Sequence, residues 1–178
     1  TKVLTTSTDD ITSLDWLELD RVTRLSTRFL DDVVEINQYP LPQIKSMTHA
    51  IRRIGLGIMG WADILFLMKI PYNSQEAITL GSRVMEFINK VAREESHQLA
   101  LERGVFPDFN ESIYANEELL RNAARTCVAP TGSISIICDC SSGIEPIFAL
   151  AFRHIVELPE GTRELTFVNY IFEQELDN

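Results

Sequence analysis

Two long stretches of the chain carry apolar side chains every three or four positions, which is the spacing of an amphipathic helix. The first covers residues 14–36, where Thr12 or Ser13 is expected to cap the start, with Asp15 in the first turn. Prolines in the segment "YPLPQ" end it, and a short helix is predicted from about 43 to 53. Its apolar positions are Leu14, Leu17, Val22, Leu25, Phe29, Val33 and Ile36.

The second long stretch predicts a helix over residues 74–103. Asn73 and Glu76 have the spacing of a capping box, and Gly104 suits a left-handed helix end. A further short helix is predicted in "NEELLRNAART", residues 116–126. The buried stripe of the long helix is predicted to consist of Ala77, Leu80, Val84, Phe87, Ile88, Val91 and Leu99.

Short apolar runs predict the strands. They are "RIGLGI" (53–58), which leads into a helix at 61–69, "TCVA" (126–129) and "IFALAFRHIVEL" (147–158). A turn at Glu160–Gly161 and a helical tail are expected to follow. Strands separated by helices predict an α/β architecture.

Three glycines interrupt the first of these runs. Gly55, Gly57 and Gly60 match the letters of a dinucleotide-binding fingerprint. That fingerprint needs an acidic residue about 20 positions later, after a second strand, but this region falls inside the predicted long helix. We therefore favour close packing of strand against helix over a nucleotide-binding turn.

The composition of the chain argues against several classes of function. The chain has 178 residues, 45% of them hydrophobic, and a formal net charge of -10. These values are typical of a globular protein and argue against a nucleic-acid binder or a protein that docks on anionic lipid. No apolar run is long enough to span a membrane, and the start lacks the features of a secretion signal and an initiator Met. This start suggests a processed, cut or split chain.

Three cysteines, Cys127, Cys138 and Cys140, form a poor framework for disulfides, so a reducing cytoplasm is the simpler location. The histidines are too scattered to complete a zinc site, and we expect no bound metal. The cysteines can pack as small apolar residues, or Cys138 and Cys140 can act near a ligand.

The segment "VAPTGSISIICDCSSGIEP", residues 128–146, holds two hydroxyl-rich turns and no lysine or arginine. Gly132 would let the backbone approach an anion, and free amides with nearby hydroxyls suit a phosphate or diphosphate. The simpler alternative is that Thr131 or Ser133 caps a helix. Glu145, in the second turn, is equally suited to a functional role and to holding a backbone N–H or an arginine.

Three segments identify a family. "RRIGLGIMGWADIL", "ERGVFPDFNESIY" and "RNAARTCVAPTGSISIICDCSSGIEPIFALAFRH" resemble the large, catalytic subunit of ribonucleotide reductases, and the likeness is closest to the adenosylcobalamin-dependent class II enzymes. The resemblance implies that residues 1–178 are one segment, the C-terminal part of the catalytic barrel. It implies the second half of a ten-stranded α/β barrel, with "RIGLGI" and "TCVAP" as barrel strands.

The resemblance also assigns residues. It implies that the substrate phosphates are bound by Pro130, Thr131, Gly132, Ser133, Ile134 and Ser135, which agrees with the anion site suggested by the turn. It assigns no catalytic residue here, because the family's radical cysteine, within Asn-x-Cys-x-Glu, and its reducing cysteine pair are absent.

The expected partners follow from the same resemblance: a ribonucleotide substrate, adenosylcobalamin in the complete enzyme, and a complementary N-terminal polypeptide that carries the radical cysteine. The complete enzyme is expected to be a homo-oligomer. Two alternatives stay open, a class I large subunit and a non-catalytic phosphate-binding or assembly module derived from the reductase.

Overall fold

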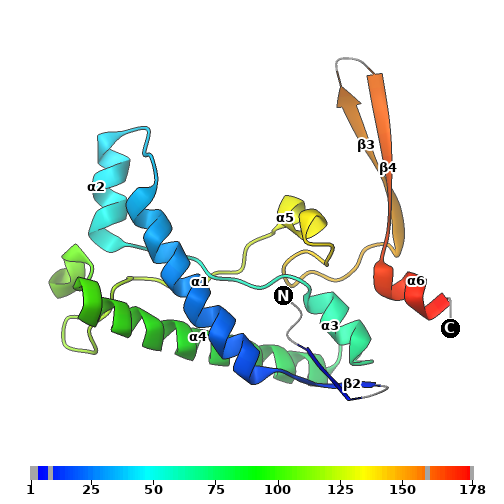
Figure 1. Ribbon diagram of the computed structural model, residues 1–178, viewed down its shortest axis with the longest axis horizontal. Helices are drawn as coiled ribbons and strands as arrows, with labels where there is room; N and C mark the ends of the chain where they lie inside the picture. Colours follow the sequence, from blue (N-terminus) through cyan, green and yellow to red (C-terminus); the bar gives the residue numbers. More distant parts are fainter. Residues whose placement is uncertain (1–3, 8–9, 159–160, 177–178) are drawn as a thin grey trace. The chain divides into compact units, whose positions relative to one another are not determined.

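The computed structural model describes residues 4–7, 10–158 and 161–176 (Figure 1). They form two compact units. The first combines the described residues up to Ile58 with Gln75–Ala129, and the second combines Met59–Ser74 with the described residues from Pro130 onward. The chain therefore passes from one unit to the other three times.

The mixture of helices and small sheets is an α/β architecture, as predicted. None of the helices in the described ranges is long and apolar enough to cross a membrane. The elements are β1 (Leu4–Ser7), β2 (Asp10–Leu14), α1 (Trp16–Ile36), α2 (Pro42–Ile51), α3 (Trp61–Leu67), α4 (Gln75–Arg103), the 3-10 helix η1 (Pro107–Glu111), α5 (Gly132–Ile137), β3 (Ala151–Leu158), β4 (Gly161–Val168) and α6 (Tyr170–Leu176).

In the first unit, α1 packs against α4. Helix α1 is capped by Asp15, whose carboxylate accepts a hydrogen bond from the amide of Glu18 at 2.9 Å. The predicted caps Thr12 and Ser13 are wrong, because both lie in strand β2, which pairs antiparallel with β1. Helix α4 ends as predicted, with Gly104 at φ +85° and its amide bonded to the carbonyl of Ala100.

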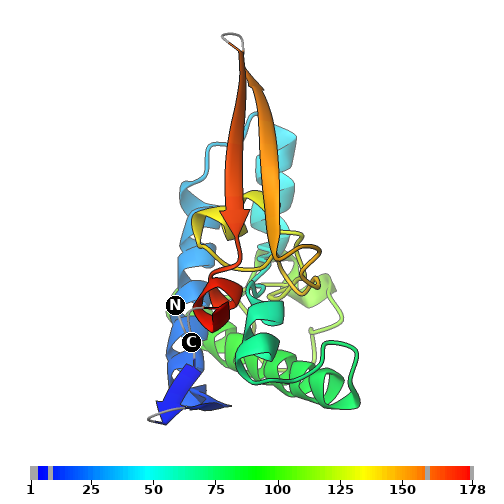
Figure 2. The ribbon, with the colours of Figure 1, turned by 90° about the vertical axis from the view of Figure 1, so that its right-hand side faces the viewer.

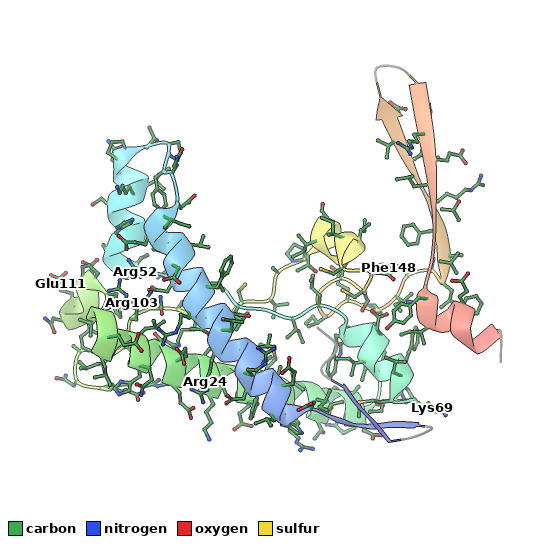
Figure 3. The ribbon with its side chains drawn as sticks, viewed as in Figure 1. Arg24, Arg52, Lys69, Arg103, Glu111 and Phe148 are labelled. Atoms are coloured by element: carbon green, nitrogen blue, oxygen red, sulfur yellow. The ribbon has the colours of Figure 1, made fainter. Side chains whose placement is uncertain are left out.

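Helix α1 contacts α4 through polar side chains (Figure 3). Arg24 donates to Glu94 at 2.6 Å, and Arg28 donates to Glu95 at 2.7 Å. The apolar stripe instead lies largely open among the described residues: Phe29 is 64% exposed and Ile36 is 78% exposed. The contact between α1 and α4 therefore consists of these ion pairs together with the ring contact of Trp16 with Phe87, whose centroids lie 5.1 Å apart, and most of the apolar stripe takes no part in it.

A buried carboxylate organises the end of this contact. Asp31 is fully buried and accepts from Arg52 at 2.9 Å and from Asn122 at 3.0 Å. Its second oxygen accepts from Arg103 at 3.2 Å and from Arg121 at 3.3 Å. Burial raises the pKa of Asp31, but these partners outweigh it, Arg52 foremost, and the net pKa is lowered. The cluster joins α1, α4 and the segment after residue 120.

The glycines at 55 and 57 allow two extended segments to touch. Leu56 and Thr126 form a parallel bridge, and the amide of Leu56 donates to Arg125 at 2.8 Å. A Cβ on Gly55 would stand 2.8 Å from Cys127 Sγ, and one on Gly57 would stand 2.7 Å from the Cys127 carbonyl oxygen. The prediction of close packing is right at Gly55 and Gly57, but the predicted helical partner is wrong, because the partner is the extended segment around Cys127. The strands predicted at 53–58 and 126–129 are reduced to this one bridge.

The short helix predicted at 116–126 is wrong. Three successive amides there donate to distant groups: Arg121 to the carbonyl of Ser96, Asn122 to the hydroxyl of Ser96, and Ala123 to the carbonyl of Ile51. These bonds hold the backbone extended, since a helix would use the same amides internally. Leu120, fully buried against Phe106 and Phe109, fixes the segment in place.

In the second unit, β3 and β4 form an antiparallel hairpin (Figure 2). The predicted strand at 147–158 is confirmed from residue 151. The predicted helical tail is wrong over residues 161–168, which form β4, and right over α6. Glu160, in the predicted turn, lies outside the described residues.

Candidate functional site

The first hydroxyl-rich turn leads directly into α5. Thr131 adopts a left-handed conformation, with φ 51°, and no side chain caps the helix. The amides of Gly132, Ser133 and Ile134 have no acceptor among the described residues, and all three residues are exposed. The alternative in which Thr131 or Ser133 caps the helix is therefore wrong, and three N–H groups stay available to a ligand.

The space around Gly132 is open. A Cβ built on this residue meets no atom within 4 Å, in contrast to Gly55 and Gly57. Nothing inside the described structure therefore requires glycine at position 132. A ligand that approaches the backbone closely would require it.

The second hydroxyl-rich turn is hydrogen-bonded to the first. The amide of Gly143 donates to Thr131 Oγ1 at 2.7 Å. Ser135, 2% exposed, donates to the carbonyl of Gly132 at 3.0 Å and shares a 2.9 Å hydroxyl–hydroxyl bond with Ser142. These bonds hold the two turns as one body, which fixes the direction of the free amides.

Asp63 anchors this body to α3. The buried carboxylate accepts from the amide of Ser141 at 2.6 Å and from the side chain of Asn169 at 3.2 Å. The amide of Gly60 donates to the carbonyl of Ser141 at 2.8 Å, and Gly60 itself is left-handed, with φ 78°. One carboxylate therefore joins α3, the second turn and the start of α6.

A pocket of about 360 Å³ lies beside these turns within the second unit. Its lining includes Ser135 and Glu145 from the turn region, Phe148, which is 86% exposed, and Tyr170 from α6 (Figure 3). Burial, and then the nearby carboxylate of Asp63, raise the pKa of the Tyr170 phenol. At neutral pH the phenol is protonated and can donate a hydrogen bond.

The six predicted phosphate-binding residues differ in their positions. Pro130, Gly132, Ser133 and Ile134 are exposed, Thr131 is half-buried, and Ser135 is buried with its hydroxyl engaged internally. The structure thus brings five of them to the surface and makes Ser135 a support for the turn. Their binding role stays a prediction.

Glu145 and the cysteines also have defined surroundings. The Glu145 side chain is exposed and takes no hydrogen bond from the described residues, so it does not hold an amide or an arginine there. Cys127 is exposed, with its Sγ 3.3 Å from the carbonyl of Gly55, and Cys138 is also exposed. Burial, together with Asp63, raises the pKa of the half-buried Cys140 thiol. No three metal-ligating side chains gather within the described ranges.

Sequence analysis missed Asp63 and Asn169. A carboxylate inside the apolar run "GWADILFLM" was a usable signal, because buried carboxylates need partners. Asn169 gave no such signal, since it follows a strand that the sequence did not predict.

Comparison with known proteins gives consistent matches. A family model described as "Ribonucleotide reductase, barrel domain" matches residues 2–120 and 117–178. A vitamin B12-dependent ribonucleoside-diphosphate reductase of Thermoplasma acidophilum is 49% identical over 91% of the chain and 21% of its own length. One from Mycobacterium tuberculosis is 45% identical over 82% of the chain and 22% of its own length. A ribonucleoside-diphosphate reductase subunit alpha of Treponema pallidum is 31% identical over 76% of the chain and 19% of its own length. The chain thus spans about a fifth of the length of these relatives.

Proposed function

The chain belongs to the ribonucleotide reductase barrel-domain family, and on this premise we propose that it is the C-terminal barrel segment of a B12-dependent ribonucleoside-diphosphate reductase. It supplies the second half of a ten-stranded α/β barrel. The remainder, including the radical cysteine, comes from the rest of a longer polypeptide or from a complementary N-terminal one. The complete enzyme is a homo-oligomer of the reducing cytoplasm.

The reaction that we propose replaces the 2′-hydroxyl of a ribonucleotide by hydrogen: two cysteine thiols of the complete enzyme supply the electrons and become a disulfide, and the hydroxyl leaves as water. This segment holds the substrate by its phosphates at the turn formed by Thr131, Gly132, Ser133 and Ile134, and Pro130 sets the direction of the backbone before it. Three amides that have no acceptor in the part of the chain that the structure describes, beside an open glycine, are the observation that supports this role. Fixing the phosphates orients the ribose for chemistry performed elsewhere.

The hydrogen bonds between the two turns make the proposed phosphate-binding turn rigid. The hydroxyl of Thr131 accepts a hydrogen bond from the amide of Gly143, and the hydroxyl of Ser135 shares one with Ser142. Both bonds hold the backbone of the turn in place. Asp63 connects the same body to α3. Donors that are already oriented lose little freedom when an anion binds, so the bound geometry is reproducible.

Adenosylcobalamin, when bound to the complete enzyme, would supply the radical. A cavity of about 360 Å³ lies at the lower end of the range for drug-sized ligands, and a corrinoid is several times larger. This pocket does not fit the cofactor, and none of the described residues is assigned to it.

Similarity favours the B12-dependent enzyme over a class I large subunit. The B12-dependent relatives are 45–49% identical to the chain, and the Treponema subunit alpha is 31% identical. The complete polypeptide is therefore expected to make deoxyribonucleotide when given adenosylcobalamin and a dithiol reductant, without a second protein subunit. Activity that instead required a separate radical-generating subunit would support the class I alternative.

Binding measurements on the complete polypeptide test the phosphate role. Gly132→Ala should raise the Kd for a ribonucleoside diphosphate at least tenfold in calorimetry, and leave the weak affinity for the unphosphorylated nucleoside unchanged. Ile137→Ala, at an exposed position of the same helix, is the matched control and should bind normally. Equal diphosphate affinity in all three proteins would refute the role.

A further inference from the structure

The β3–β4 hairpin leaves open strand edges. Its strands pair over eight consecutive residue pairs, from Ala151↔Val168 to Leu158↔Gly161. Within the part of the chain that the structure describes, their sheet has no third strand (Figure 2). Each strand therefore has an outer edge that pairs with no further strand among the described residues, and such an edge is a template for another strand.

The edge of β3 has only part of the usual protection, namely the charged side chains Arg153 and Glu157. Residues 151–158 contain no proline and no lysine, and the pairing runs without a bulge. By contrast, the pairing of β1 with β2 is interrupted between Thr5 and Thr6. A long regular edge of this kind is expected to be covered when the protein functions.

The charge pattern of β3 is complementary to that of a second, antiparallel copy of β3. Arg153 and Glu157 lie two residues before and after Ile155, so all three share one face of the strand. Ile155 is 61% exposed, and the Arg153 side chain is 68% exposed. An antiparallel pair of two β3 strands centred on Ile155 therefore places each arginine opposite the glutamate of the other copy.

Other pairings lose this match. A shift of the centre to residue 154 or 156 removes both arginine–glutamate pairs. Two β4 strands centred on Glu164 would place like charges opposite each other, which is unfavourable. The charge pattern thus selects one edge and one register.

We propose that β3 pairs with β3 of a second copy of this chain, forming a four-stranded antiparallel sheet about a two-fold axis at Ile155. Such an isologous contact closes on itself and does not extend into a fibre. Arg153 already donates to Glu164 at 3.2 Å, and its five N–H donors can serve both carboxylates. This contact is independent of the proposed reductase activity.

Charge reversal in the complete polypeptide tests the contact. Arg153→Glu and Glu157→Arg each place like charges opposite in a homodimer, and each should raise the Kd of assembly about tenfold or more in analytical ultracentrifugation. An equimolar mixture of the two variants restores both opposite-charge pairs, because each copy supplies the residue that the other needs. We expect the mixture to assemble as well as the wild type.

Arg163→Glu, an exposed charge reversal on β4, is the matched control and should assemble normally. Restoration on mixing distinguishes the contact from a loss of folding, which mixing cannot repair. Single variants that assemble like the wild type would overturn the proposal and favour coverage of this edge by other parts of the longer polypeptide. A mixture no better than its components would overturn it as well.

Discussion

Gly57 and Gly132 have different surroundings, and substitution by alanine is expected to affect them in opposite ways. Gly57 faces the carbonyl oxygen of Cys127, where an added Cβ would stand at 2.7 Å. Gly132 faces open space at the start of α5. The first is required by the fold, and the second is not.

Thermal or denaturant unfolding separates these roles. Gly57→Ala should destabilise the protein by about 1–3 kcal/mol, because a backbone atom cannot move aside. Gly132→Ala should be neutral or stabilising by up to about 1 kcal/mol, because alanine favours the helical conformation. A large loss of stability in Gly132→Ala would show that the glycine serves the fold and not a ligand.

The cysteines differ in reactivity for physical reasons. Cys127 and Cys138 are exposed, whereas burial raises the pKa of Cys140 and reduces its thiolate fraction at neutral pH. Brief iodoacetamide treatment at pH 7.5, followed by mass spectrometry, should label Cys140 last. Faster labelling of Cys140 than of Cys127 would contradict this description of its surroundings.

At the scale of elements, the helices were the easiest features to predict. The periodicity of residues 74–103 indicated α4 and its Gly104 end correctly. Periodicity alone could not show that α1 turns polar side chains toward α4, because that choice depends on partners such as Glu94 and Glu95. The failed helix at 116–126 has the same cause, since its amides are taken by Ser96 and Ile51.

Asp31 makes the packing of α1 sensitive to acid. Its folded pKa is lowered from 3.8, so its contribution to stability is complete above that value and is lost as the pH falls through the folded pKa. Unfolding free energy should therefore decline steeply below about pH 4, measured by circular dichroism.

Asp31→Asn supplies the matched test. It should cost about 3–5 kcal/mol at pH 7, because it removes the buried carboxylate that Arg52 shares with two other arginines and leaves Arg52 only its exposed partner Glu35, and it should flatten the acid-dependent decline. Arg21→Met removes only an exposed pair with Glu18 and should change stability by less than about 1 kcal/mol. Equal effects of both substitutions would exclude a special role for the buried cluster.

The backbone turn of the candidate site could be predicted from the sequence, but the side chains that hold the turn in place could not. The order proline, threonine, glycine, serine indicated a turn with free amides, and the structure has that turn at 130–135. The sequence could not show that the hydroxyl of Ser135 is hydrogen-bonded to Ser142, or that Asp63 and Asn169 anchor the second turn. The contacts of Asp63 join residues far apart in the chain, and local patterns carry no information about them.

At the scale of the whole molecule, the chain spans about a fifth of the length of its relatives. It lacks the Asn-x-Cys-x-Glu sequence that the family uses to form its thiyl radical. The purified 178-residue chain should therefore make no deoxyribonucleotide, even with adenosylcobalamin and a dithiol reductant. Product formation above the background of a Gly132→Val control would contradict the proposal that this segment binds the phosphates while the radical chemistry takes place elsewhere.

A structure of the complete polypeptide bound to a ribonucleoside diphosphate would show whether the turn at 130–135 holds the substrate phosphates. We predict phosphate oxygens within hydrogen-bonding distance, about 2.7–3.2 Å, of the amides of Gly132, Ser133 and Ile134. The turn should keep its bonds from Thr131 to Gly143 and from Ser135 to Ser142. A diphosphate bound elsewhere, with these three amides facing only water, would contradict the account.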